Sequence, residues 1–175
     1  MKRVFGLLVA VTLLLTGVFS ANYVLLQRHL NNIIESDFRN EGISIRSHYG
    51  LYVNSKILVF DLLAISSQNA PADIFRVLLQ YSEALQDRTF DKIVLEYDGT
   101  PKFDLLGDFF QETGIEYGVQ NAVYTMRTFP ENVYEMDGTH AFGTWTGGLL
   151  GVATRQLDDF SEFHKRWYVT EMLNN

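Results

Sequence analysis

The amino-terminal segment constrains this chain more than any other feature. Two basic residues, Lys2 and Arg3, precede an apolar stretch over residues 4–21 that contains no charged residue. A short basic region followed by an apolar stretch is typical of export signals and membrane anchors. Basic residues stay on the cytoplasmic side of a membrane, so we expect the rest of the chain to face outward.

Two interpretations of this segment remain open. In the first it is an uncleaved anchor, because residues 4–26 supply 23 positions without a charge or a proline and about 20 apolar residues cross a bilayer. In the second it is a signal peptide cleaved after Ser20, with Val18 and Ser20 as acceptable residues at the third and first positions before the cut. We favour the anchor. It places the protein in the cytoplasmic (inner) membrane with a periplasmic C-terminal domain, whereas cleavage would release a secreted or periplasmic protein.

The residues after the apolar stretch predict an amphipathic helix. Apolar residues recur at three- and four-residue spacing between polar ones, at Leu26, Leu30, Ile33, Ile34 and Phe38. We expect Gly42 to end this helix, because glycine tolerates the left-handed conformation found at helix ends. The chain is thereby divided into a signal peptide or membrane anchor over 1–26, an amphipathic stalk helix over 27–41 and an exported domain over 42–175.

The pattern after Gly42 predicts an α+β fold. Runs of β-branched residues indicate strands, and apolar residues at helical spacing indicate helices. Asp98-Gly99 is a hairpin signal, and hairpins imply antiparallel pairing. We therefore expect a small antiparallel sheet of β-β-α-β-β-α order behind the N-terminal hydrophobic helix, with a long C-terminal helix across it. The expected elements are strands over 43–46, 56–65, 92–97 and 102–105 and helices over 71–88, 107–113 (ended by Gly114), 121–128 and 146–172.

Composition excludes several classes of protein. The 175 residues include no cysteine, which rules out a disulfide scaffold, zinc fingers and thiol catalysis. The 14 basic and 21 acidic residues give a net charge of −7, so we expect no nucleic-acid partner. The four histidines are scattered without the spacing of metal ligands, and we expect neither a metal nor a cofactor.

No residue pattern predicts catalysis. Asp61 lies in a hydrophobic strand, as does the nucleophile of aspartate-based phosphotransferases, but Leu63 occupies the position of the second acidic residue that those sites need. We therefore expect Asp61 to bond a neighbouring backbone amide. His140 follows Asp137 in a loop-rich region without a serine in a nucleophile turn. A hydrolase using Asp137 and His140 is kept only as an alternative, and we expect the protein not to be an enzyme.

An aromatic segment is the candidate partner-binding feature. Residues 117–145 contain six aromatic residues, and tyrosine, tryptophan and arginine are the types that anchor protein interfaces. Tyr124, Arg127, Tyr134 and Trp145 are therefore the candidate partner-binding residues. The same rings would equally serve to hold an irregular segment to the core.

A glycine run at the expected start of the last helix is the candidate ligand-binding feature. Backbone amides at a helix start can hold an anion, and glycines let a ligand approach, which makes Gly147 and Gly148 the candidate ligand-binding residues. Close packing of the helix start on the sheet is the alternative, and it is the one we favour for these glycines.

These features predict a non-enzymatic protein anchored in the cell envelope. Two of the 14 basic residues lie within residues 1–20, so the remainder of the chain carries a net charge of −9. We expect this acidic domain to bind a protein partner or to self-associate, with the membrane contacted through the N-terminal helix. The alternative is a soluble periplasmic or secreted domain, released by signal cleavage, that binds a small ligand.

Overall fold

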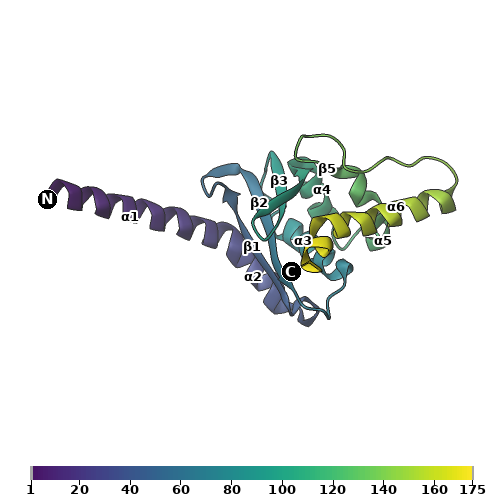
Figure 1. The fold of residues 1–175 in the computed structure, drawn as a ribbon, viewed down its shortest axis with the longest axis horizontal. Helices are drawn as coiled ribbons and strands as arrows, with labels where there is room; N and C mark the ends of the chain where they lie inside the picture. The colour runs from purple at the N-terminus through teal and green to yellow at the C-terminus, as the bar shows by residue number, and fades with distance from the viewer. Residues whose placement is uncertain (1, 175) are drawn as a thin grey trace.

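The computed structural model describes residues 2–174 and consists of a long N-terminal helix attached to an α+β domain (Figure 1). The helix comprises α1 (Lys2–Asn22), a π-helical segment η1 (Tyr23–Gln27) and α2 (Arg28–Ser36), and the backbone stays right-handed helical across both junctions. It is long and apolar enough to cross a membrane. Its first part projects away from the domain, and its last part lies beside β1 (Figure 1).

The domain is built on a five-stranded sheet with the strand order β1-β2-β3-β4-β5. The strands are β1 (Ile43–Gly50), β2 (Asn54–Ile65), β3 (Lys92–Tyr97), β4 (Thr100–Leu106) and β5 (Val133–Tyr134). The predicted α+β fold is confirmed. Three neighbouring strand pairs are antiparallel as expected, but β2 and β3 are parallel. They are parallel because α3 (Pro71–Ala84) returns the chain to the end of the sheet at which β2 began.

Two helices cover one face of this sheet and close the core. One is α3, and the other is the C-terminal helix, which comprises α6 (Leu149–His164), a π-helical segment η4 (Lys165–Val169) and α7 (Thr170–Met172). The ring of Phe60 in β2 lies between them, 5.9 Å from Tyr81 of α3 and 6.1 Å from Trp167 of η4 between centroids. All three side chains are fully buried. The predicted long C-terminal helix is confirmed.

Turn chemistry determines where several elements begin and end. Asp98 and Gly99, with φ of 47° and 75°, form the predicted two-residue turn between β3 and β4. The C-terminal helix begins at Leu149 rather than Thr146, because Gly147 has a φ of 134° that no helix accommodates. The remaining elements are η2 (Phe38–Asn40), α4 (Gly107–Glu116), α5 (Ala122–Thr128) and η3 (Phe129–Asn132).

Gly114 does not end a helix, contrary to the prediction. It lies inside α4, where a Cβ would come within 2.4 Å of the carbonyl oxygen of Ser82 in α3. Glycine therefore allows α3 and α4 to pack closely at this point. The hydroxyl of Ser82 donates a hydrogen bond to the carbonyl of Phe110 in the same contact.

Candidate functional site

The junction between the N-terminal helix and the β1–β2 hairpin is the most specific polar arrangement in the molecule. β1 is an edge strand, which leaves part of its backbone without a neighbouring strand. Gln27 occupies this edge: its Oε1 accepts a hydrogen bond from the amide of Ser47 at 2.6 Å, and its Nε2 donates to the carbonyl of Ile45 at 3.0 Å. One helical side chain thus takes the place of a partner strand.

Asn22 makes the corresponding contacts one and a half turns earlier in the helix. Its Oδ1 accepts from the amide of Tyr49 at 2.8 Å, and its Nδ2 donates to the carbonyls of Tyr52 and Val18, both at 2.8 Å. The side chain is only 4% exposed. Asn22, which the sequence places within the apolar segment, is therefore the first described residue of the helix that is buried against the domain.

Apolar contacts continue this attachment through the amphipathic segment. Leu26 and Leu30 are fully buried in the domain core, and Ile33 and Ile34 pack against it in half-buried positions. These residues lie on the apolar face that the helical spacing predicts. From Asn22 onward the helix is thus part of the domain, because its side chains form hydrogen bonds with the hairpin and contribute to the hydrophobic core of the domain.

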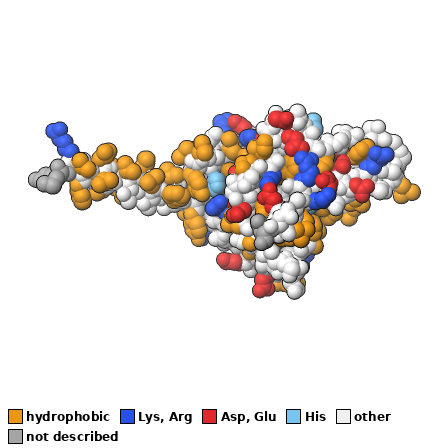
Figure 2. Space-filling view, viewed as in Figure 1, with side chains coloured by type: hydrophobic (Ala, Val, Ile, Leu, Met, Phe, Trp, Pro, Cys, Tyr) orange, Lys and Arg blue, Asp and Glu red, His pale blue; other side chains and the backbone are white. Residues whose placement is uncertain are grey.

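The preceding part of the helix has the opposite character. Residues 4–21 rise about 27 Å at 1.5 Å per residue, close to the thickness of a bilayer core. In water so much contiguous apolar surface would be an aggregation hazard. Figure 2 shows it as a nearly uncharged rod that ends at the domain. Its large apolar side chains more than 60% exposed are Val4, Phe5, Leu7, Leu8, Leu13 and Leu14.

A buried carboxylate links β1, β2 and the turn between β3 and β4 on the other face of the sheet. Asp61 of β2 is fully buried; its Oδ2 accepts a 2.5 Å bond from the guanidinium of Arg46 in β1, and its Oδ1 accepts from the amide of Gly99 at 3.0 Å. The expectation that Asp61 bonds a backbone amide is confirmed. Glu96 is its register neighbour on β3, and burial, together with the Asp61 charge, raises the pKa of Glu96.

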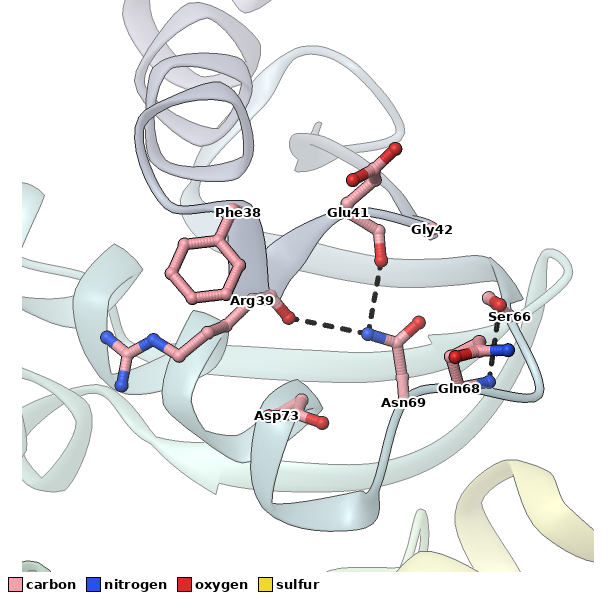
Figure 3. Close-up of a pocket in the computed structure, with 8 residues that line it drawn as sticks. All are labelled: Phe38, Arg39, Glu41, Gly42, Ser66, Gln68, Asn69 and Asp73. Atoms are coloured by element: carbon pink, nitrogen blue, oxygen red, sulfur yellow. Dashed lines mark hydrogen bonds between the residues drawn. The ribbon is translucent and has the colours of Figure 1, made fainter.

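A cleft of about 560 Å³ lies at the carboxyl end of β2, between η2 and the β2–α3 loop (Figure 3). Its polar groups mainly bind each other: Asn69 Nδ2 donates to the carbonyls of Glu41 at 3.1 Å and Arg39 at 3.4 Å. Asp73 accepts from the amide of Ala70 at 2.7 Å. The hydrogen bonds of the lining residues therefore connect two loops. No lining residue forms a pair of nucleophile and general base with another.

Charged side chains beside this cleft are also paired with each other. Arg39 forms a bidentate ion pair with Asp37, which lowers the pKa of that carboxyl to about 2. The guanidinium of Arg76 donates to Asp73 at 2.7 Å, and hydrogen bonds from Ala70 and Arg76 lower the pKa of Asp73 against the effect of burial. Arg76 also donates to Oδ1 of Asn40 at 2.8 Å and lies 3.8 Å from Asp37, which fixes the start of α3 against the turn that follows the long helix.

The candidate partner-binding residues lie on three separate elements. Arg127 of α5 donates two hydrogen bonds to Gln156 of α6, at 3.1 and 2.8 Å. Trp145, in the loop before α6, donates from Nε1 to Asp159 at 2.6 Å. The structure thus brings Arg127 and Trp145 to one helix, α6.

The two tyrosines in this set have different surroundings. Tyr134 of β5 instead contacts the ring of His140 at 4.5 Å between centroids. Tyr124 of α5 is 52% exposed and is the candidate most available to a partner.

The candidate ligand-binding glycines have no surrounding cradle. Gly147 and Gly148 are exposed, and a Cβ on either would have no described atom within 4 Å. Close packing of these glycines on the sheet, the explanation we favoured, is therefore wrong. Gly148 instead serves as the extended residue that precedes α6, and Gly147 supplies the positive φ before it.

The residues of the hydrolase alternative, Asp137 and His140, form hydrogen bonds with other partners and not with each other. Asp137 accepts from the amide and the hydroxyl of Thr139, at 3.0 and 2.7 Å, and these bonds lower its pKa. His140 Nδ1 lies 3.2 Å from the carbonyl of Glu131. Among residues 2–174, no group of three or more histidine or acidic side chains is arranged to hold a metal ion.

His164 is a buried polar residue that sequence reasoning missed. It is 1% exposed among Phe160, Phe163, Trp167 and Tyr168, and neither ring nitrogen has a hydrogen-bond partner within the described part of the chain. Burial lowers its pKa to about 3. The signal was present, because position 164 follows Phe160 by four residues on the apolar stripe of the last helix.

Comparisons with family models, with curated proteins and with solved structures find no match for this chain. No relative therefore assigns a role to any of these residues. The junction at Asn22 and Gln27 remains the feature with the most specific geometry.

Proposed function

We propose that this protein is a single-pass membrane protein that holds a non-enzymatic, acidic binding domain at the outer surface of the cytoplasmic membrane. The observation that carries the proposal is the change of character within one unbroken helix at Asn22. Before it the side chains are mostly apolar and exposed; from it onward one side of the helix, which includes Asn22, Leu26 and Leu30, is bonded to the domain or buried in it. A helix with this division fits lipid on one side of the boundary and water on the other.

The helical continuity supports an anchor rather than a cleaved signal. Cleavage after Ser20 would remove Phe19, whose ring contacts Tyr52 at 5.1 Å, and Val18, whose carbonyl accepts from Asn22. These contacts belong to the junction that fixes the domain on the helix. Lys2 and Arg3 at the far end support an orientation with the domain outside.

The α5–α6 end of the domain is the surface we assign to a protein partner or a second copy of the chain. It lies at the opposite end of the molecule from the start of α1, so it would point away from the membrane (Figure 1). Val123, Tyr124, Leu150 and Leu157 are exposed there, between 44 and 84%. The guanidinium of Arg155 lies 4.6 Å above the ring of Trp145, which gives this apolar end a cationic aromatic feature.

Fractionation of the full-length chain tests the anchor. The protein would carry a C-terminal tag, be produced in a bacterium with two membranes, and be washed in the membrane fraction with alkaline carbonate. We expect it to stay in the membrane at its full intact mass, and to be digested by protease only after the outer membrane is opened. Release with a mass lacking residues 1–20 would instead support the soluble ligand-binding alternative, and full-length protein in the cytosol would overturn both.

A further inference from the structure

The tip of the β1–β2 hairpin exposes large apolar side chains, which are unfavourable in contact with water. Leu51 is 89% exposed and Val53 is 68% exposed, and they flank the half-buried Tyr52. Leu51 and Tyr52 have φ of 48° and 63°, a left-handed conformation that turns normally assign to glycine, asparagine or aspartate. The turn thus presents large apolar side chains at a backbone position where small polar residues are the ordinary choice.

The tip is held beside the end of the projecting part of α1. The ring of Tyr52 contacts that of Phe19 at 5.1 Å and stacks on that of His48 at 4.1 Å, and its carbonyl accepts from Asn22. The hairpin points toward the same side of the domain as the N-terminus of the chain (Figure 1). The apolar surface of the helix and that of the tip therefore adjoin.

The height of the tip along the helix corresponds to a membrane surface. With Arg3 at the cytoplasmic boundary, Phe19 lies about 24 Å further along the helix axis, near the outer limit of a bilayer core about 30 Å thick. Tyr23 and Tyr52 then lie at the level where tyrosine rings favour the lipid–water interface.

Charge also favours lipid as the occupant of this surface. No charged residue occurs from Tyr49 to Ser55, whereas the chain after residue 20 carries a net charge of −9. Acidic surfaces are repelled by anionic headgroups, so the uncharged tip is a part of the domain that can approach them closely.

We propose that the hairpin tip, Leu51 to Val53, inserts into the outer interfacial layer of the same bilayer that α1 spans. It forms a second membrane contact that sets the orientation of the domain. This inference rests on the proposed function, because it requires α1 to cross the bilayer.

Single-cysteine labelling tests the contact in the full chain, which has no native cysteine. Leu51→Cys and Val53→Cys would each carry an environment-sensitive fluorophore after reconstitution into vesicles of zwitterionic and anionic phospholipids. Leu14→Cys reports on α1, and Leu150→Cys is the exposed apolar control at the far end of the domain. Circular dichroism checks that each variant keeps its fold, and the two tip positions check one another.

We expect spin-labelled lipids with shallow quenchers to reduce tip fluorescence by at least twofold, with a blue-shifted emission, while Leu150→Cys stays unquenched. Quenching of Leu14→Cys by deep quenchers without quenching at the tip would overturn this inference and leave the anchor intact. A blue shift at the tip without lipid quenching would mean that protein covers it, which also overturns the inference. Absence of quenching at Leu14 would overturn the anchor itself.

Discussion

The side chain of Asn22 bonds the N-terminal helix to the β1–β2 hairpin, with its Nδ2 2.8 Å from the carbonyl of Tyr52. Its Oδ1 accepts from Tyr49 on the same hairpin, also at 2.8 Å. Because Asn22 is buried at the point where the preceding helix is exposed, these bonds couple the direction of α1 to that of the sheet. If α1 crosses a membrane as proposed, this attachment would set the orientation of the domain relative to the bilayer.

Replacing Asn22 by leucine tests this coupling. The change extends the apolar segment, but it leaves the amide of Tyr49 and the carbonyl of Tyr52 without their partner. We expect a loss of about 2 to 4 kcal/mol in the free energy of unfolding, since each unpaired buried group costs about 1 to 3 kcal/mol. Denaturant unfolding in detergent measures it. The matched control is Asn32→Leu on the exposed side of α2; equal stability of the two variants would contradict the prediction.

Replacing Asp61 tests the polar link across the sheet. We expect Asp61→Ala to lower the free energy of unfolding by about 2 to 4 kcal/mol, because the amide of Gly99 and the guanidinium of Arg46 both lose their acceptor. Asp61→Asn keeps an acceptor for Gly99 and should cost less. Asp91→Ala breaks only an exposed pair with Lys56 and should cost less than about 1 kcal/mol. Chemical denaturation measures the free energy of unfolding of the three variants. A loss for Asp61→Asn or Asp91→Ala as large as that for Asp61→Ala would refute the prediction.

Because His164 is buried in its neutral form, we expect the protein to lose stability in acid. The pKa of His164 is about 3 in the folded protein, below the ordinary value of 6.5 that applies when the chain unfolds. Between these values the unfolded state binds more protons, so stability is fully present above pH 6.5 and declines as the pH falls toward 3, by up to about 1.4 kcal/mol per unit. His48, whose pKa burial also lowers, acts in the same direction. Urea titrations at pH 7 and pH 5 measure the free energy of unfolding. Its decrease between the two pH values should be smaller for His164→Phe than for the native chain, and an equal decrease would contradict this.

Tyr124 is the sharpest test of the partner surface, because its ring is exposed and its removal should not disturb the core. If the α5–α6 end binds a partner, Tyr124→Ala should weaken the complex by tenfold or more, as at interface hot spots that contribute about 2 kcal/mol. Cross-linking in native membranes, with the adduct quantified by mass spectrometry, measures this. Phe38→Ala removes an even more exposed ring elsewhere and serves as the control. An unchanged adduct with Tyr124→Ala would remove this surface from consideration.

Local patterns allowed much of the fold to be predicted, because they report on backbone conformation and on which side chains face the core. The strand through Phe60, the turn at Asp98 and Gly99 and the long last helix follow from such patterns. The parallel pairing of β2 with β3 does not, since it depends on how α3 crosses the sheet. Gly114 illustrates the same limit: its neighbour Ser82 is distant in sequence, and only packing distinguishes it from a helix stop.

The junction between the N-terminal helix and the hairpin is harder to predict, because residues such as Asn22 and Leu26 are compatible both with a membrane helix and with a protein interior. Within an apolar run Asn22 is a tolerable polar interruption of a membrane helix, and nothing local shows that it bonds to Tyr52, 30 residues away. Leu26 likewise fits either lipid or a protein core; in the structure it is fully buried in the domain. Arg127 and Trp145 are candidates by residue type alone, and their shared contact with α6 depends on the three-dimensional packing of segments that are distant in sequence.

Collision accessibility of spin labels along the N-terminal helix tests the central claim most directly. Single labels at Leu8, Leu15 and Leu30 of the reconstituted full chain would be exposed to oxygen, which concentrates in lipid, and to a water-soluble nickel complex. We expect Leu8 and Leu15 to be accessible to oxygen and protected from nickel, and Leu30 to be protected from both because it lies in the domain core. Nickel access at Leu8 and Leu15, or protection of both positions from both reagents, would show that lipid does not surround this helix.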